Sequence, residues 1–377
     1  AFKEMFRYAG SEEAYQGLAK EISKRPTYKL MKEAKLALTD MGSALADREE
    51  AFMSNWAEKI PGFGKIARAS NRAYSGFLNK LRADTFDDIL AKAKLAGVQE
   101  TQGLISSAAN FVNSATGRGS LGSLQGSYPL FNAIFFSPRL MASRINLLNP
   151  NFYMKLDPFV RKEALKSLVS FGALGTTAIS LAKLGGANVG DDPRSADFGK
   201  IKIGNTRYDN WGGFQQYMVL ATRLATGKMI DSTTGKEFDL SEGFGSQGRL
   251  GALARFFEFK TSPVASFALG QLRGKTAIGE EAKVAPEVLK RFIPMLAQDI
   301  FETYRERGIK GIPMATPAVF GVGTQSYGPK VPLIERTKFG QPVVKFKQPA
   351  GLAETIINKI TGTEVSNIPP ERRAAIL

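Results

Sequence analysis

Apolar positions recur at helical spacing through the first 97 residues of the chain, and polar residues lie between them. Ser11-Glu12-Glu13 is a helix start, and Pro26 interrupts the pattern that follows it. Asp84, with further acids at 87 and 88, is a second candidate cap, because carboxylates favour the first turn of a helix. The predicted helices run from Ser11 to Ile22, from Thr27 towards Met53, from Ile66 to Leu81 and from Asp84 to Gly97.

The pattern changes twice after residue 97. Residues 98–127 are small and polar. Ser106–Asn113 can form a helix, but Gly117–Gly126 is loop-like and matches no nucleotide-binding glycine motif, so a linker or surface loop is expected there. Residues 128–149 are rich in aromatic and aliphatic side chains and hold Arg139 and Arg144 as their only charges. A segment of this kind is normally buried. If it is exposed, it seats in a partner or at a bilayer interface.

A long apolar helix is predicted from Pro158 to Leu184, with Asp157 as its N-cap. Its uncharged part, Ser167–Ala182, has 16 residues, fewer than the roughly 18–20 that cross a bilayer. Small residues in it let another helix approach closely. Three interpretations stay open: a core helix, a subunit contact, and a helix that enters a membrane under some conditions. The candidate assembly or membrane contacts of the whole chain are Phe131, Phe135, Phe136, Phe171, Gly172, Gly175 and Trp211.

Three segments predict β-hairpins. The first joins residues 200–203 to 206–208 across Gly204-Asn205, and the others span 228–240 and 331–346. Lys200, Lys202 and Arg207 would give the first hairpin an outward basic face, and they are the candidate contacts to a nucleic-acid backbone or other phosphate. Further helices are expected at 214–226, 250–259, 264–272, 286–304 and 352–360.

These elements predict a mainly α fold, an irregular multi-helix assembly with two or three small β-hairpins and an extended C-terminal segment. The 38 Gly and 18 Pro favour short helices and irregular connections over a regular bundle. The expected regions are an N-terminal helical region (1–97), a Gly/Ser-rich linker (98–127), a central helical region with hairpins (128–310) and an extended Pro/Gly-rich C-terminal arm (311–377).

Charge and composition narrow the classes of partner. Lys and Arg outnumber Asp and Glu by 51 to 35, a formal net charge of +16. Such an excess favours polyanionic partners, namely DNA, RNA, anionic lipid or an acidic protein, although a merely soluble basic protein is the plainer interpretation. The sequence contains no helix-turn-helix, RRM or zinc-finger pattern, so sequence-specific recognition of nucleic acid is not expected.

The residue types of the usual catalytic sites are missing. The chain has no Cys and no His, which removes thiolate nucleophiles, disulfides and the commonest general base. Asp191, Asp192 and Asp197 form the densest acidic set, but their spacing does not match a calcium loop, and a solvated loop that pairs with Arg194 is expected instead. We therefore expect no enzyme, no cofactor and no metal.

One stretch resembles a known family. It reads DDPRSADFGKIKIGNTRYDNWGG over Asp191–Gly213 and continues FQQYMVLATRLATGK over Phe214–Lys228. Further matching pieces are STTGK from Ser232, RFFEFK from Arg255, SPVASF from Ser262 and FFSPR from Phe135. These pieces resemble the C-terminal region of the large polyvalent proteins of tailed bacteriophages. The resemblance covers roughly residues 128–275 and does not extend to the first 100 residues or the tail.

The resemblance implies a component of the virion, an internal or ejection protein near the portal that is delivered with the genome. Its implied partners are copies of itself, the portal or other virion proteins, packaged DNA and the host membrane during infection. The implied location is inside the capsid or at the portal and tail, then the host envelope or cytoplasm. The chain begins at Ala1 without a signal-peptide pattern, so a piece of a longer chain or a processed product is expected. The alternative function is a nucleic-acid-binding accessory protein without sequence specificity.

Overall fold

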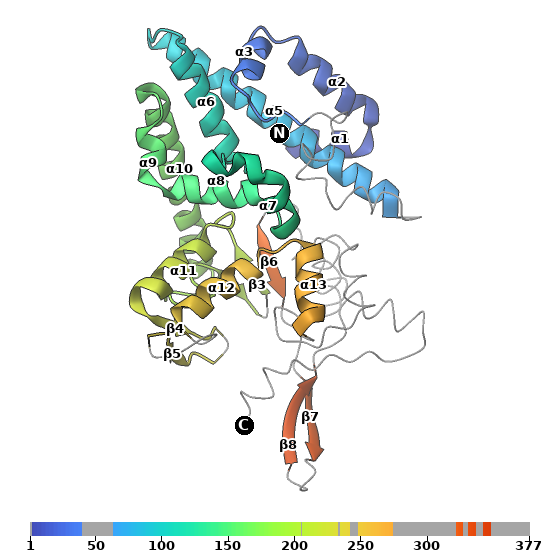
Figure 1. The fold of residues 1–377 in the computed structure, drawn as a ribbon, viewed down its shortest axis with the longest axis vertical. Coiled ribbons are helices and arrows are strands. Elements are labelled where there is room, and N and C mark those ends of the chain that lie inside the picture. Colours follow the sequence, from blue (N-terminus) through green and yellow to red (C-terminus); the bar gives the residue numbers. More distant parts are fainter. Residues whose placement is uncertain are drawn as a thin grey trace. The chain divides into compact units, whose positions relative to one another are not determined.

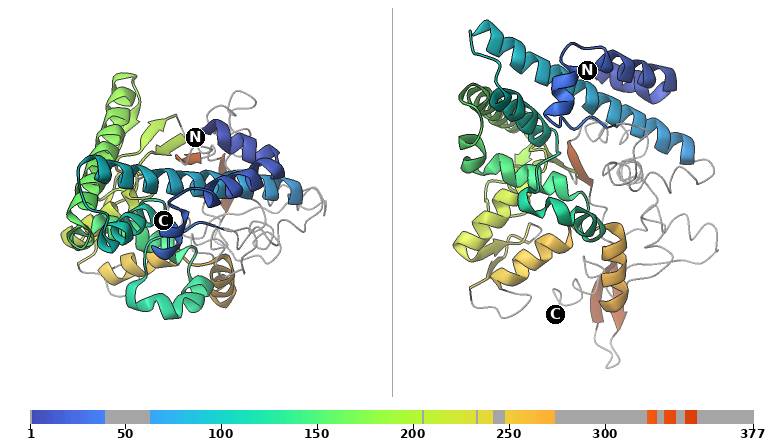
Figure 2. Two further views of the ribbon diagram at one scale, coloured as in Figure 1. Left: turned by 90° about the horizontal axis from the view of Figure 1, so that it is seen from above. Right: turned by 45° about the horizontal axis from the view of Figure 1, so that its top comes forward.

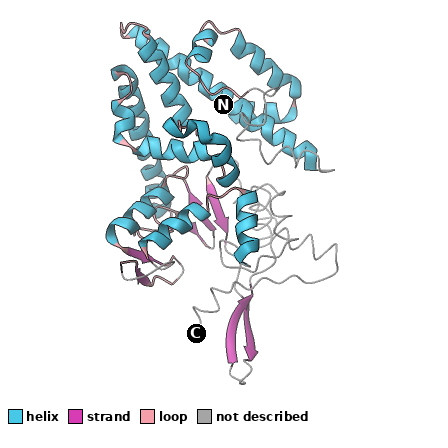
Figure 3. Ribbon diagram, in the orientation of Figure 1, coloured by secondary structure: helices cyan, strands magenta, loops and turns pink. Residues whose placement is uncertain are grey.

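The computed structural model describes residues 2–39, 63–204, 206–232, 234–241, 248–273, 322–326, 331–336 and 342–347 of the 377-residue chain. It confirms the mainly α fold with small antiparallel strands (Figures 1 and 3). Two compact units divide the chain, Ala1–Ala173 and Leu174–Leu377. Their boundary lies inside a helix, not at either end of the expected 98–127 linker.

The first unit, in its described residues, is built of helices. They are α1 (Phe2–Gly10), α2 (Glu12–Ser23), α3 (Tyr28–Glu33), α5 (Phe63–Leu95), α6 (Gln102–Ala115), α7 (Tyr128–Ile134), α8 (Pro138–Leu148), α9 (Pro150–Met154) and the first part of α10 (Pro158–Leu184), with a 3-10 turn at Gly122–Ser127. Ser11 caps α2 as expected, because its hydroxyl accepts from the backbone N–H of Ala14 at 3.1 Å.

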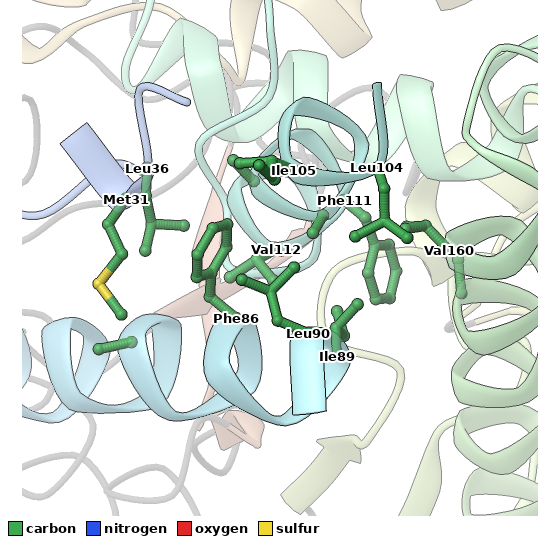
Figure 4. Packing of buried hydrophobic residues seen from close by; sticks show 14 of the residues in the cluster. Met31, Leu36, Phe86, Ile89, Leu90, Leu104, Ile105, Phe111, Val112 and Val160 are labelled. Carbon is green, nitrogen blue, oxygen red and sulfur yellow. The ribbon is translucent and has the colours of Figure 1, made fainter. Parts of the chain in front are cut away.

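The core of this unit lies where α3, α5 and α6 meet, and Val160 of α10 closes it. Figure 4 shows Phe86 of α5 and Val112 of α6 pointing toward one another, with Met31 of α3 beside them. All four side chains are fully buried. Burying a large apolar side chain contributes roughly 1.5–3 kcal/mol, so this cluster holds the first unit together.

The helix expected from Thr27 towards Met53 is wrong for residues 34–39, because α3 ends at Glu33. Lys35 has φ 56°, a left-handed conformation that turns the chain out of the helix. The carboxamide of Asn113 on α6 then holds the extended segment, accepting from the Ala37 N–H at 2.8 Å and donating to the Lys35 carbonyl at 3.0 Å. A tertiary contact thus outweighs local helix propensity. Residues 40–62 lie outside the described part.

Helix α5 is continuous over 33 residues, so the two helices expected at 66–81 and 84–97 are one. Asp84 and Asp87 are not caps. They lie in the middle of α5 and accept hydrogen bonds from Arg25 after α2, at 2.8 and 2.9 Å. The two acids expected to start a helix are therefore the partners of a basic residue that lies 59 and 62 positions earlier in the chain.

The expected linker at 98–127 contains a core helix. Six apolar residues and Ser114 of α6 are buried. The small residues that suggest a linker let α6 lie close to α5. Arg82 of α5, itself fully buried, donates to the Thr116 hydroxyl at 2.9 Å and to the Ala37 carbonyl at 2.8 Å, which ties the end of α6 in place. Only the later part of the segment, the exposed turn at Gly122–Ser127, fits the expectation of a surface loop.

The described residues of the second unit combine the end of α10 with short strands and three helices. They are β1 (Asn188–Val189), β2 (Ile201–Ile203), β3 (Thr206–Asp209), α11 (Gln215–Thr226), β4 (Lys228–Ile230), β5 (Glu237–Asp239), α12 (Arg249–Glu258), α13 (Pro263–Arg273), β6 (Gly323–Ser326), β7 (Val331–Arg336) and β8 (Pro342–Lys347). All three expected hairpins are confirmed, as β2–β3, β4–β5 and β7–β8.

The first hairpin belongs to a four-stranded antiparallel sheet in the order β1-β2-β3-β6. Lys202 of β2 lies opposite Arg207 of β3, and Arg207 lies opposite Gln325 of β6. Helices α11 and α12 lie side by side (Figures 1 and 2) and meet through the rings of Tyr217 and Phe256, edge to face at 5.2 Å. The helices expected at 286–304 and 352–360 lie outside the described residues.

Candidate functional site

A charged pocket of about 260 Å³ lies beside the first hairpin, between the loop that leads to β2 and the β4–β5 turn. Its lining residues are Asn188, Gly190, Asp191, Asp192, Ser195, Asp197, Lys200, Lys202, Arg207, Ile230, Asp231, Ser232 and Gly235. All three basic residues singled out on the hairpin therefore line one pocket, together with the acidic loop. Arg207 and Asp197 join the two sets in an ion pair.

Arg194 fixes the first half of the loop. Its guanidinium donates to both carboxylate oxygens of Asp192, at 3.0 and 2.7 Å, and to Glu237 of β5 at 2.7 Å. The backbone N–H of Arg194 donates to Asp192 as well, at 2.8 Å. These hydrogen bonds, chiefly those from the guanidinium, lower the pKa of Asp192. The expected pairing of the loop with Arg194 is confirmed, while Glu237 as a second partner was not foreseen, because it is 43 positions away.

Arg207 points inward. Its Nε donates to Asp197 at 2.6 Å, and both side chains are largely buried. The outward basic face expected for the hairpin is therefore wrong for Arg207, since its charge is neutralised by a loop carboxylate. A buried carboxylate next to a buried guanidinium is the arrangement that avoids an isolated charge in a poorly solvated place.

The other two basic residues differ from each other. Lys202 is exposed, as a contact to a phosphate backbone requires. Lys200 is half-buried, and its burial lowers the pKa of the ammonium group, although the nearby carboxylates of Asp209 and Asp197 partly offset this. The hairpin thus offers one fully solvated cation rather than a basic stripe.

The acidic set does not converge on one point. Asp192 pairs with Arg194, Asp197 pairs with Arg207, and Asp191 lies 3.7 Å from Lys183. Within the described residues, no group of three or more acidic side chains is arranged to hold a metal ion. The arrangement is a loop braced by the ion pairs of Asp192 and Asp197 with arginines.

Trp211 fastens α10 to this loop. Its indole N–H donates to the Gly199 carbonyl at 3.1 Å, and its ring covers Gly175, where an added Cβ would lie 2.7 Å from the ring. Asn210 donates to the Gly175 carbonyl at 3.2 Å. Gly175 and Trp211 were expected to contact a partner or a membrane. The structure brings them against each other instead, because the glycine leaves room for the indole.

The remaining candidate contact residues are half-buried or exposed. Phe131 and Phe135 stack on one another with their rings 6.2 Å apart, Phe171 and Gly172 are half-buried, and Phe136 is exposed. Other large apolar side chains are exposed on the same helices, and those on α7 and α8 belong to the 128–149 segment that was expected to be buried or, if exposed, to seat in a partner or at a bilayer interface. On α7 and α8 they are Leu130, Ile134, Leu140, Ile145 and Leu148, and on α10 they are Leu165, Leu168, Val169, Leu174, Leu181 and Leu184.

Helix α10 is mostly uncovered. Only its first turns, with Val160 and Ala164, enter the core of the first unit, so the core-helix interpretation holds for that end alone. In the described part of the chain it is the one helix long and apolar enough to cross a membrane by length and composition, and 11% of its apolar 18-residue window is buried. The 16 uncharged residues fall short of a span because they end at Lys166 and Lys183, whereas the helix itself continues beyond both lysines.

Comparisons with known proteins give no match to a family, to a curated protein or to a solved structure.

Proposed function

We propose that this chain is a non-enzymatic structural component of a phage virion, an internal or ejection protein that assembles near the portal and takes part in genome delivery. The resemblance of Asp191–Lys228 to phage polyvalent proteins supports the virion as its setting. The exposed apolar surface of α10 supports assembly. Both observations are needed, because an exposed apolar surface alone does not identify the assembly to which it belongs.

The observation that carries the proposal is the uncovered apolar length of α10. Val169, Leu174 and Leu181 are each more than 60% exposed on a helix that has no charged residue between Lys166 and Lys183. Covering such a side chain contributes roughly 1.5–3 kcal/mol, so a neighbouring surface in an assembly would gain substantially from this face. Large apolar side chains left exposed along one helix in this way are typical of interaction sites.

The polar groups of the loop support the non-enzymatic part. An acid–base catalyst needs a titratable group that is free to exchange a proton with a substrate. The carboxylates of Asp192 and Asp197 are each held by a guanidinium, and the chain contains no His and no Cys to take their place. The geometry supports a fixed scaffold around the hairpin.

The direct test is to locate the chain in particles. Virions of the phage that encodes it would be purified and analysed by mass spectrometry and by cryo-electron microscopy. We expect several symmetric copies at or beneath the portal. A Leu174→Ser, Leu181→Ser variant should be depleted from particles, while Leu250→Ser, an exposed leucine on α12, should be incorporated normally. If the chain is absent from virions and monomeric at micromolar concentration, the proposal fails.

A second candidate is a nucleic-acid-binding accessory protein, and the net charge of +16 favours it. It predicts DNA binding that weakens steeply with salt, because neutralised phosphates release counterions. Lys202→Gln, which removes an exposed cation of the hairpin, should lower the salt slope by about one. If the chain does not bind DNA at low salt, this candidate is excluded.

A further inference from the structure

Several cations of the second unit are paired with carboxylates, but two arginines of α11 and α12 are not. The paired ones lie 2.6 to 3.7 Å from a carboxylate oxygen, and they are Lys183, Arg194, Arg207 and Lys228. Arg223 of α11 and Arg255 of α12 form no ion pair with a carboxylate of the described residues. Their charges are therefore available to an anion from outside this part of the chain.

Arg223 is held in place although it has no carboxylate partner there. It is half-buried, and its Nε donates to the backbone carbonyl of Arg194 at 2.7 Å. Burial lowers the pKa of its guanidinium, and the positive charge of Arg255 lowers that pKa further. Two like charges thus act on each other across α11 and α12. An anion bound beside them would reduce this repulsion and replace the hydration that burial removes.

Contacts between side chains keep α12 against α11. Tyr217 and Phe256 meet edge to face with their ring centres 5.2 Å apart. Lys260, two residues after α12 ends, donates to the side-chain oxygen of Gln216 and lies 5.4 Å from the centre of the Phe256 ring. Lys260 too forms no ion pair with a carboxylate of the described residues. The paired helices therefore carry three cations on a surface that aromatic packing fixes.

An uncovered aromatic ring lies one helical turn from Arg255. Phe259 caps the end of α12, its side chain is 54% exposed, and its N–H donates to the Arg255 carbonyl at 3.1 Å. Residues four positions apart on a helix share a face, so the ring and the guanidinium are neighbours. No ring of the described residues packs on Phe259, whereas Phe256 and Phe257 contact each other at 5.6 Å. The ring is open to a partner beside an unpaired cation.

We propose that Arg223, Arg255 and Phe259 bind single-stranded nucleic acid. The two guanidiniums hold a backbone phosphate, and the ring of Phe259 stacks on an unpaired base. Proteins that bind single strands without sequence preference combine cations that follow the backbone with aromatic side chains that stack on bases. The inference deepens the second candidate function, because it supplies a site outside the hairpin and a class of ligand. It does not rest on the virion role.

The exposed ring distinguishes a single strand from the other anionic partners. A duplex offers phosphates to the arginines, but its base faces are covered by stacking, so Phe259 would remain in water. An acidic protein segment offers carboxylates without a flat surface for the ring. A single strand supplies the phosphate and the base face together, within one or two nucleotides.

The test is fluorescence anisotropy of the full chain with a labelled oligothymidylate of about 20 nucleotides, used alone and paired with oligoadenylate. Phe259→Leu keeps an apolar side chain but removes the ring, so it should weaken single-strand binding about tenfold and duplex binding less than about twofold. Phe259→Tyr keeps an aromatic ring and should bind as the unchanged chain does. Arg255→Gln should weaken binding about fivefold, with a salt slope smaller by about 0.7, because one phosphate contact is lost.

Two matched controls separate the site from general charge and exposure. Arg249→Gln removes the same charge from the start of α12, near Asp239, and Phe136→Leu removes a ring that is 51% exposed in the first unit. Both should bind within about twofold of the unchanged chain. Circular dichroism and the thermal transition show whether each variant is folded.

Three results would overturn the inference. They are no single-strand binding at low salt, folded Arg255→Gln and Phe259→Leu variants that bind as the controls do, and equal competition by polyglutamate, which offers carboxylates but no bases. Binding that Lys202→Gln weakens while Arg255→Gln and Phe259→Leu do not would exclude this site and leave the second candidate function standing. The inference and that candidate can therefore fail separately.

Discussion

The buried ion pair between Asp197 and Arg207 gives a sharp test of how the hairpin is held. Asp197→Asn keeps the shape of the side chain and one acceptor oxygen but removes its charge, which leaves the guanidinium of Arg207 without its carboxylate at 2.6 Å. The side chains are 17% and 8% exposed, so water replaces little of the lost interaction. Asp191→Asn is the matched change on the same loop, because Asp191 is 78% exposed and 3.7 Å from Lys183.

The two variants should differ by several kcal/mol. Removing one partner of a buried pair costs about 3–5 kcal/mol, and the retained amide oxygen places Asp197→Asn at the lower end, about 3 kcal/mol. An exposed pair contributes only about 0–1 kcal/mol, so Asp191→Asn should change the free energy of unfolding by no more than that. The comparison isolates burial, since both changes replace an aspartate of the same loop by asparagine.

Urea unfolding followed by Trp211 fluorescence measures this difference in the second unit. The chain has two tryptophans, and Trp56→Phe leaves Trp211, which lies against Gly175 and Gly199, as the reporter. With a slope of about 2–3 kcal/mol per molar urea, a loss of 3 kcal/mol moves the midpoint by about 1 M. A double-mutant cycle with Arg207→Gln then separates the pair from the single losses. If both asparagine variants unfold within about 0.5 kcal/mol of each other, the buried pair does not stabilise the hairpin and the reasoning is wrong.

Three further results are expected. Phe86→Ala should lower the stability of the first unit by about 3–5 kcal/mol, measured by thermal circular dichroism, because the ring is fully buried in its core. Gly175→Val should displace Trp211, shift its emission to longer wavelength and cost about 1–3 kcal/mol, whereas Gly172→Ala, with open space around its Cβ, should be neutral or slightly stabilising. Burial lowers the pKa of Lys200 below 10.5 in the folded state, so the unfolded chain binds more protons; urea midpoints should rise as the pH increases from the folded pKa towards 10.5, and Lys200→Met should flatten that rise.

Local patterns in the sequence were sufficient for the hairpins and for several helix starts. The β2–β3 and β4–β5 pairs follow from short segments around turn residues, and Ser11 caps α2 because a hydroxyl there satisfies an unpaired N–H. These features depend on residues a few positions apart. They can therefore be predicted without knowing what else the chain folds against.

Contacts between distant residues account for the errors. Asp84 and Asp87 have the composition of a helix start, and only the position of Arg25 makes them mid-helix ion-pair partners. The small residues of α6 suggest a linker until α5 is found packed against them. In each case the local sequence fits two structures equally well, and a residue far along the chain determines which of them forms.

The candidate site likewise has features that the local sequence predicts and features that depend on distant contacts. The sequence located the loop and the hairpin and gave Arg194 as a partner of the loop. It could not show that Arg207 turns inward, because this depends on β6 covering one edge of β3 and on Asp197 lying beneath it. Nor could it show that Trp211 occupies the space left by Gly175, since nothing in a glycine indicates which side chain will cover it.

The late position of β6 in the sequence affects how the sheet of the second unit forms during synthesis. Asp209 of β3 pairs with Gly323 of β6, so two adjacent strands of one sheet are separated by the 113 residues from 210 to 322. While the ribosome synthesises the chain up to residue 322, β3 has a neighbour on one side only, and its other edge carries unsatisfied backbone groups. An expression fragment that stops at the end of α13 would keep that edge open permanently. It would invite pairing with any extended segment, including the β6 strand of another copy, whereas a fragment that ends after Ser326 closes the sheet from within.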